Sequence, residues 1–234
     1  MQVPQLSILI NDQFTLGNVD DMNLATLFYV YDPMCSWCWG YKPTWTFLEE
    51  QLKQQFPQLS IEYRLGGLAA DTDEPMPEEM EEFLQQTWQQ VSQQLGTEFN
   101  FDFWAKCQPR RATYPACRGV LLARDKGLEQ QFYQAVQQAY YLEAKNPSDD
   151  DTLINIATEL GMDSSAFACA LNSENTQQCL QQEINQTRRL PIQGFPSLVM
   201  ALNGDLILIE LDYKNAQTSF KQIESLMQEA VLDA

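Results

Sequence analysis

Two cysteines separated by two residues are the strongest chemical signal in this chain. Cys35 and Cys38 enclose Ser36 and Trp37, and the motif follows a compact apolar run, 24–31, rich in β-formers and aromatics. On the first turn of a helix this spacing puts both sulfurs on one side, close enough for a disulfide. The pattern predicts a dithiol that exchanges with other thiols and disulfides.

The two sulfurs are expected to act differently. Cys35 would stand at the start of a helix running to Phe56, where unpaired backbone N–H groups and the helix dipole stabilise a thiolate. Cysteines at such positions have a pKa below the usual value of about 8.5. We therefore expect Cys35 to be the nucleophile that forms a mixed disulfide. Cys38, one turn inside the helix, would remain a thiol and resolve that intermediate.

A zinc site or a pair of inert thiols are the alternatives for the same motif. Zinc would need two further soft ligands, and the chain contains no histidine. The ligands would have to come from Cys107, Cys117, Cys169 and Cys179, none of which forms a second pair with this spacing. We therefore expect redox chemistry without a metal or a bound cofactor, and glutathione as a co-substrate stays open.

Composition narrows the possible partners and the compartment. The 234 residues carry a formal net charge of -18, which disfavours nucleic acid and anionic membranes as partners. No apolar run approaches the roughly 18 residues that a membrane span requires. Residues 1–21 lack the features of a secretory signal, and six cysteines are too few for a disulfide-stapled scaffold. We expect a protein of the reducing cytoplasm.

The elements that would position the dithiol form two β units. The first contains strand 24–31, helix 37–56 and an alternating strand at 59–65, and a right-handed crossover would make its strands parallel neighbours. Pro43 would sit in the first turn of that helix or kink it. The second unit contains strand 197–202, an Asn203-Gly204 hairpin signal, strand 206–211 and a final helix at 215–232.

Residues 68–190 contain no convincing strand and are predicted to be an all-helical insertion. Helical stretches are expected at 78–95, 115–142, 149–160, 164–171 and 174–188, with Asp149 and Ser164 as N-caps. Residues 1–23 would be an N-terminal extension in which Leu6 to Ile10 could pair at a sheet edge. The prediction is one α/β domain, 24–67 and 191–234, interrupted by residues 68–190.

This order of motifs resembles the DsbA-like branch of the thioredoxin superfamily. Within that branch it is most similar to a cytoplasmic group of predicted protein-disulfide isomerases, related to FrnE-type proteins and 2-hydroxychromene-2-carboxylate isomerases. The resemblance runs from about residue 24 onward and rests on Asp32 to Gly40, Ala116-Cys117-Arg118 and Gly194-Phe195-Pro196-Ser197. It implies an α/β thioredoxin fold with a large helical insertion. It also implies oxidoreductase or isomerase activity on protein or low-molecular-weight thiols and disulfides.

The resemblance also implies where the substrate lies. Pro196 would form a cis peptide bond and face the dithiol, and the backbone beside it would pair with an extended substrate segment. Phe195 would flank the sulfur. Trp37, with Trp39 and Tyr41, either forms a substrate surface or packs the helix onto the sheet. The Ser-Trp dipeptide lacks the histidine of strongly oxidising periplasmic relatives, so the reduction potential stays open.

The remaining cysteines and a local group of arginines have open roles. Cys117 could approach the dithiol from the insertion as a third thiol. The other three cysteines, Cys107, Cys169 and Cys179, are expected to be buried and to behave as small apolar residues. The three arginines of the insertion, Arg110, Arg111 and Arg118, could stabilise a thiolate or bind a carboxylate of glutathione, or could simply be solvated or paired with acids.

Two other functions remain open beside the oxidoreductase. The large insertion and the acidic surface would suit an adaptor that binds partners, with or without control by the redox state of Cys35. A glutathione-dependent transferase or isomerase ranks third. Its relatives commonly carry a serine nucleophile where this chain has Cys35, which argues against that isomerisation.

Overall fold

The structure is a computed structural model, and it describes residues 25–232. The predicted N-terminal extension, the short apolar stretch within it and the expectation drawn from residues 1–21 lie outside the described residues. None of the described helices is both long enough and apolar enough to cross a membrane.

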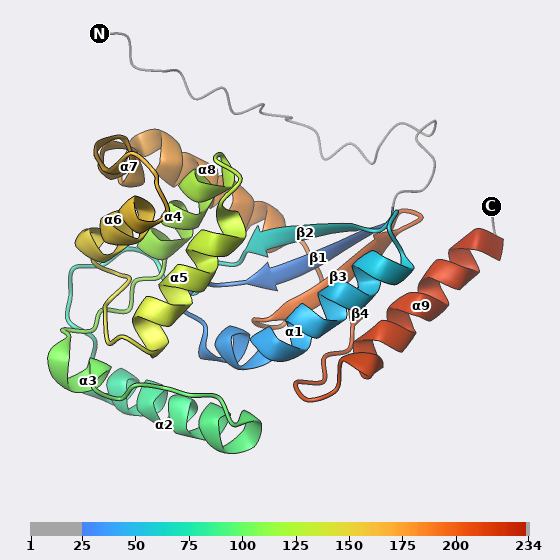
Figure 1. Ribbon diagram of the computed structural model, residues 1–234, viewed down its shortest axis with the longest axis horizontal. Coiled ribbons are helices and arrows are strands. Elements are labelled where there is room, and N and C mark those ends of the chain that lie inside the picture. Colours follow the sequence, from blue (N-terminus) through green and yellow to red (C-terminus); the bar gives the residue numbers. More distant parts are fainter. Residues whose placement is uncertain (1–24, 233–234) are drawn as a thin grey trace, which may run out of the picture.

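A four-stranded sheet in the order β2-β1-β3-β4 forms the centre of the fold (Figure 1). Its strands are β1 (Thr26–Tyr31), β2 (Ser60–Leu65), β3 (Ser197–Leu202) and β4 (Asp205–Ile209). β1 pairs with β2 in parallel, as the crossover rule predicted, and β3 pairs antiparallel with both β1 and β4. The sheet therefore joins the two β units, which are more than 130 residues apart in the sequence.

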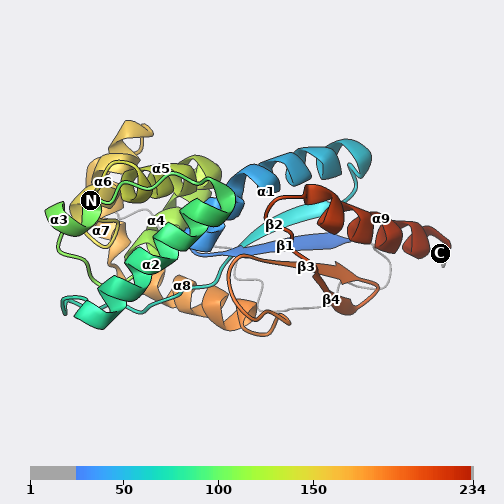
Figure 2. The same cartoon turned by 90° about the horizontal axis from the view of Figure 1, so that it is seen from below.

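Alternation along β1 gives the sheet two apolar faces. Leu27 and Tyr29 belong to the main core, with apolar side chains of α1 (Ser36–Gln55), whereas Phe28 and Val30 belong to a smaller cluster on the other face. α1 lies along one side of the sheet, and α9 (Ala216–Leu232) packs against α1 and β4 (Figure 2). Trp45, in the third turn of α1, stacks on Tyr29 with 4.4 Å between the ring centroids. This packing fixes the start of α1 at the end of β1.

The hairpin between β3 and β4 forms where the sequence predicted it. Asn203 has φ 53° and Gly204 has φ 88°, so both central residues of the turn are left-handed. Two-residue hairpin turns of this kind match the right-handed twist of the strands, which is why Asn-Gly favours them. β4 is displaced slightly from the predicted strand, beginning at Asp205 and ending at Ile209.

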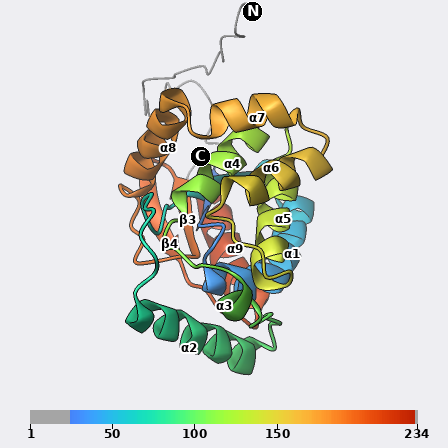
Figure 3. The same ribbon diagram turned by 90° about the vertical axis from the view of Figure 1, so that its left-hand side faces the viewer.

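The described residues between β2 and β3 are helical and contain no strand, which confirms the α/β fold with a helical insertion. Figures 1 and 3 show these helices gathered at one end of the sheet, with α2 lying apart from α4 to α8. Their bounds are α2 (Glu78–Leu95), α3 (Phe103–Lys106), α4 (Tyr114–Arg124), α5 (Glu129–Tyr141), α6 (Asp150–Glu159), α7 (Ser164–Leu171) and α8 (Glu174–Thr187).

Several local predictions were wrong. The predicted helix at 115–142 is two helices, because the chain turns at 125–128 and Gly127 takes φ +71°. The N-cap of α7 is Asp163, whose carboxylate accepts the Ala166 N–H at 2.9 Å, so Ser164 is the first helical residue. Asp149 does stand at the N-cap of α6, but its side chain makes no capping bond. Pro43 lies inside α1, beyond its first turn.

One continuous core runs through the sheet and the insertion. It includes Leu48 from α1, Phe132 from α5 and Ile184 from α8, all fully buried. The boundaries predicted for the insertion, 68 and 190, stay predictions, because side chains from both sides of them share this core.

Candidate active site

Cys35 stands at the junction of β1 and α1, as predicted, and its sulfur lies between two backbone groups. It is the N-cap residue of α1, and its Sγ accepts the backbone N–H of Cys38 at 3.4 Å. The same sulfur contacts the backbone carbonyl of Phe195 at 3.4 Å, as a thiol donating to that oxygen.

Cys38 is more deeply buried than Cys35. Its exposed fraction is 0%, against 6% for Cys35, and both thiols are free. Burial raises the pKa of Cys38 well above its usual value, and the hydrogen bond and charge of the neighbouring Cys35 raise it further. The geometry therefore leaves Cys35 as the reachable sulfur and keeps the proton on Cys38.

The residues that lead into β3, opposite the dithiol, have the expected backbone conformation. The Phe195–Pro196 peptide bond is cis, which confirms the expectation for Pro196. Pro196 itself is buried, whereas Phe195 is half-buried and presents its carbonyl to Cys35. Pairing of this backbone with a substrate segment stays a prediction.

Gly66, at the end of β2, makes room for Phe195. A Cβ at Gly66 would overlap the ring of Phe195, so only glycine allows the ring to lie there. The sequence marked Gly66-Gly67 only as the end of a strand. Nothing local to Gly66 indicates a ring that comes from a residue more than 120 positions later.

Asp32 is a second residue of the site whose role the sequence did not disclose. It follows β1 directly, is fully buried, and accepts the N–H groups of Met34 and Leu68, each at 2.8 Å. It also accepts the hydroxyl of Thr113 at 2.7 Å and the thiol of Cys117 at 3.7 Å. Burial raises the pKa of Asp32, and these hydrogen bonds partly offset that rise. The carboxyl group links the Cys35 loop, the loop after β2 and the start of α4.

Beside Cys35 lies a small depression of about 260 Å³, which we call the dithiol groove. Its apolar walls come from the Cys35 loop and the start of α1, the segment between β2 and α2, α2 itself and the β3 entry. They include Met34, Trp37, Leu68, Met76, Leu84 and Phe195. The exposed Phe83 also lines it. The groove is therefore apolar and opens next to the reachable sulfur.

The three aromatic residues around the dithiol separate into two groups. Trp37 lines the dithiol groove and also packs edge-on against Tyr213, and its role as a substrate surface stays a prediction. Trp39 stacks on Tyr141 and Tyr41 is fully buried, which makes both of them packing residues.

Cys117 bonds to Asp32, and the other three cysteines differ from their expectation. Cys117 is fully buried and donates to Asp32, and burial followed by the charge of Asp32 raises the pKa of its thiol. The expectation that the other three are buried was wrong: Cys169 is exposed, and Cys107 and Cys179 are half-buried. In an amphipathic helix a small residue fits either face, so the sequence did not settle which way they point.

The three arginines of the predicted basic group have different surroundings. Arg118 is buried and pairs with Asp71, and its guanidinium also donates to Leu171 O and Asn172 Oδ1. Arg110 pairs with Asp149 and lines the dithiol groove. Arg111 lines the groove too, and among the described residues it has no ion-pair or hydrogen-bond partner.

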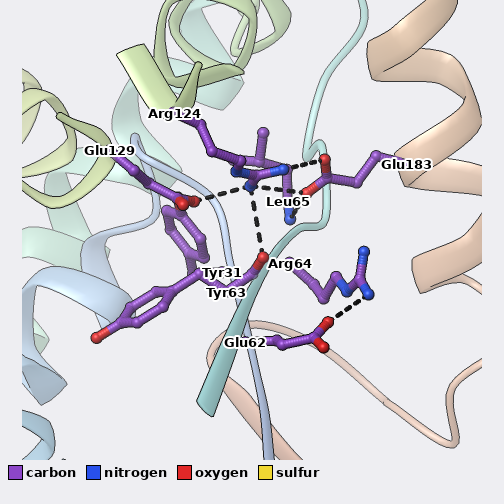
Figure 4. Close-up of polar contacts among 8 residues, drawn as sticks. All are labelled: Tyr31, Glu62, Tyr63, Arg64, Leu65, Arg124, Glu129 and Glu183. Atoms are coloured by element: carbon purple, nitrogen blue, oxygen red, sulfur yellow. Dashed lines mark hydrogen bonds and ion pairs between the residues drawn. The ribbon is translucent and has the colours of Figure 1, made fainter. Parts of the chain in front are cut away.

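A partly buried ionic network holds the insertion against the edge of the sheet (Figure 4). Arg124 of α4 bonds Glu183 of α8 at 2.6 Å and Glu129 of α5 at 2.7 Å. Glu183 also accepts the backbone N–H of Leu65 at 2.8 Å, and Glu129 accepts the hydroxyl of Tyr31 at 3.2 Å. The ends of β1 and β2, from which the Cys35 loop and the Gly66 loop depart, are thus tied to three helices.

Metal binding has no evident site in the described part of the chain. Between residues 25 and 232, no group of three or more Cys, Asp or Glu side chains is placed to hold a metal ion.

Comparison with known proteins places the chain in a family. A family model described as the DSBA-like thioredoxin domain matches residues 26–218. Among solved structures, a candidate protein disulfide isomerase from Nitrosomonas europaea is 27% identical, with a TM-score of 0.73 over 88% of this chain and 98% of that one. The cytosolic disulfide reductase DsbM from Pseudomonas aeruginosa is 22% identical, with a TM-score of 0.68 over 88% of this chain and 100% of that one.

DsbM has also been solved with glutathione, and that structure is 21% identical, with a TM-score of 0.65 over 87% of this chain and 99% of that one. The uncharacterized protein YwbO of Bacillus subtilis is 24% identical over 180 residues, which are 76% of this chain and 86% of that protein. The family match spans most of the described residues, including both cysteines of the dithiol and the cis-proline. The protein belongs to the DSBA-like thioredoxin domain family.

Proposed function

We propose that the protein is a thiol-disulfide oxidoreductase that works through Cys35 and Cys38. The observation that carries the proposal is the position of the Cys35 sulfur at the N-cap of α1, between the Cys38 N–H and the Phe195 carbonyl. A sulfur at a helix start is stabilised as a thiolate, and the thiolate is the form that attacks disulfides. Membership of the DSBA-like family supports thiol-disulfide chemistry in general.

The exchange proceeds in two steps. The Cys35 thiolate attacks one sulfur of a substrate disulfide, which forms a mixed disulfide and releases the other sulfur as a thiolate. Cys38 then loses its proton to water and attacks the Cys35 sulfur, which releases the second substrate thiolate. The protein is oxidised by two electrons to the Cys35–Cys38 disulfide, and the substrate is reduced to two thiols. The same steps in reverse would oxidise a substrate dithiol.

Both protein and low-molecular-weight disulfides are proposed substrates, with glutathione as a co-substrate. The complex of DsbM with glutathione supports a small thiol at this fold. A cytoplasmic location is part of the proposal, supported by the description of DsbM as cytosolic.

Three single variants test the proposal. Cys35→Ser should abolish reduction of a model disulfide, because no other thiol stands at a helix start beside a groove. Cys38→Ser should accumulate the mixed disulfide at Cys35, detectable as a mass increase equal to one substrate half. Cys169→Ser removes an exposed thiol outside the site and should leave the rate unchanged. Full activity in Cys35→Ser would refute the proposal.

A further inference from the structure

The dithiol groove differs in charge from the rest of the chain. The formal net charge is -18, with 14 basic and 32 acidic residues. Among the described residues that line the groove, two are arginines, Arg110 and Arg111, and none is acidic. The surroundings of the reachable sulfur are thus locally basic in an acidic protein.

Only one of these two arginines is available to a ligand. Arg110 pairs with Asp149 at 2.7 Å and also donates to the carbonyl of Ser148, so its charge is already compensated. Arg111 is half-buried and has no such partner among residues 25–232. It lies close enough to the fully buried Tyr140 for its charge to lower the pKa of that hydroxyl, against a larger rise from burial. A guanidinium in this position offers its fork of N–H donors to the groove.

We propose that Arg111 binds a carboxylate of the substrate, so that the site selects small disulfides carrying a carboxylate near the sulfur–sulfur bond. The inference rests on the proposed function and names the substrate class of that same site. Arginine suits this role because its planar fork matches the two oxygens of a carboxylate. The apolar walls of the groove would hold the carbon chain between the carboxylate and the sulfur.

The size of the groove favours a small ligand. Its volume of about 260 Å³ lies just below the usual range of small-molecule pockets, roughly 300–1,000 Å³. The net negative charge of the chain disfavours anionic ligands, because a negative field lowers the local concentration of anions. A preference for anionic disulfides would therefore have to come from a local contact, since the overall field of the protein opposes it.

Three symmetrical disulfides with the same two-carbon arm provide matched probes: 3,3′-dithiodipropionate, 2-hydroxyethyl disulfide and cystamine. They end in a carboxylate, a hydroxyl and an ammonium group. Reduced full-length protein is mixed with each probe and quenched with acid, and oxidation of the Cys35 peptide is followed by mass spectrometry. The exposed Cys169 in the same chain reports the intrinsic reactivity of each probe, so the ratio of the Cys35 rate to the Cys169 rate is compared.

Variants then assign the preference to one residue. In the unaltered protein the ratio should be highest for the carboxylate probe. Arg111→Gln should lower it about fivefold for that probe alone, as expected for a partly exposed charge pair. Arg111→Lys keeps the positive charge but lacks the planar guanidinium, so the ratio for the carboxylate probe should fall less than in Arg111→Gln. Arg189→Gln changes the net charge equally at an exposed position away from the groove and should change nothing.

Two failures of the experiment have different meanings. If Cys35 reacts with all three probes and the carboxylate is not favoured, or if Arg111→Gln leaves its ratio unchanged, the inference is overturned and the proposed function survives. If none of the probes oxidises Cys35, the proposed function itself fails. Circular dichroism of each variant checks that the fold is retained, and Arg189→Gln controls for net charge.

Discussion

At the scale of single residues, the two sulfurs of the dithiol differ in exposure and in hydrogen bonding. Cys35 can be reached from the groove and has a backbone N–H directed at its sulfur, whereas Cys38 is enclosed. The pKa of Cys38 is raised by burial first and by the neighbouring Cys35 second. In the mixed disulfide Cys35 has no charge and no longer shares a proton, so burial, the largest cause of the raised pKa of Cys38, remains together with the smaller effects of Asp32.

The second step of the exchange should therefore depend on pH. Because burial keeps the pKa of Cys38 raised, its thiolate fraction at neutral pH is small and grows about tenfold with each pH unit. We expect decay of the Cys35 mixed disulfide to accelerate in the same proportion between about pH 6 and pH 8. Quenched-flow alkylation and mass spectrometry would measure it. A decay rate independent of pH over that range would show that Cys38 deprotonation does not limit the step.

Cys117 is expected to be a hydrogen-bond donor rather than a third redox thiol. Its sulfur donates to Asp32 from a fully buried position, and burial raises the pKa of its thiol well above the usual value. Cys117→Ser keeps a donor for Asp32, and Cys117→Ala removes it. Both variants should still form the Cys35–Cys38 disulfide, with a larger loss of stability for alanine. Loss of that disulfide in the serine variant, seen by peptide mapping, would count against this assignment.

At the scale of elements, two loops that leave neighbouring strands position the dithiol. The β1–α1 loop carries Cys35, and the loop after β2 supplies Gly66, over which Phe195 lies. The cis peptide bond before β3 then places the Phe195 carbonyl 3.4 Å from the sulfur. The position of one ring thus governs one of the two contacts of the reactive sulfur.

Gly66→Ala should disturb the site more than an alanine elsewhere in the same region. The new Cβ would displace the Phe195 ring and with it the carbonyl at Cys35. We expect the reaction of Cys35 with a model disulfide to change several-fold and stability to fall by about 1–3 kcal/mol. Gly194→Ala is the matched control, because a Cβ there meets nothing within 4 Å. If Cys35 reacts at the same rate in the two variants, measured by stopped-flow kinetics, Gly66 does not influence the reactive sulfur through Phe195.

The elements that the sequence predicted are those defined by local patterns. The strand before Cys35 and the Asn203-Gly204 hairpin each depend on residues within a few positions of one another. The split between α4 and α5 was missed although the sequence marks it: the polar residues 124–127 interrupt the apolar pattern, and Gly127 is a typical helix-end residue. The roles of Asp32 and Gly66 were missed because each depends on partners that only the folded chain brings together. The sequence offered carboxylate binding as one alternative for three arginines, and only the groove distinguishes Arg111 from the other two. The cis state of Pro196 came from the family resemblance alone.

At the scale of the whole molecule, the insertion and the sheet share one core and one ionic network. Arg124 joins Glu183 and Glu129, and these carboxylates reach the ends of β1 and β2. The network meets the sheet at Tyr31 and Leu65, the last residues of β1 and β2 (Figure 4). Movement of the helices relative to the sheet would therefore disturb the loop after β2 and, through Phe195, the sulfur.

Breaking this network should destabilise the protein as a unit. Arg124→Met leaves the buried Glu183 without its cation, and we expect the free energy of unfolding to fall by about 2–3 kcal/mol. Arg64→Met is the control, because its pair with Glu62 on the sheet surface is more exposed and is worth less than about 1 kcal/mol. Urea denaturation followed by circular dichroism would compare them. Equal losses in the two variants would show that the network does not join the insertion to the sheet.

A redox titration would show whether Cys35 and Cys38 form a working redox pair. The protein is equilibrated with mixtures of reduced and oxidised glutathione, quenched with acid, alkylated and mapped by mass spectrometry. We expect a single, reversible two-electron transition between the free thiols and the Cys35–Cys38 disulfide, with the same midpoint from either direction. Failure of the Cys35–Cys38 disulfide to form across the whole series would contradict it, and a binding role for the fold would then be the better account.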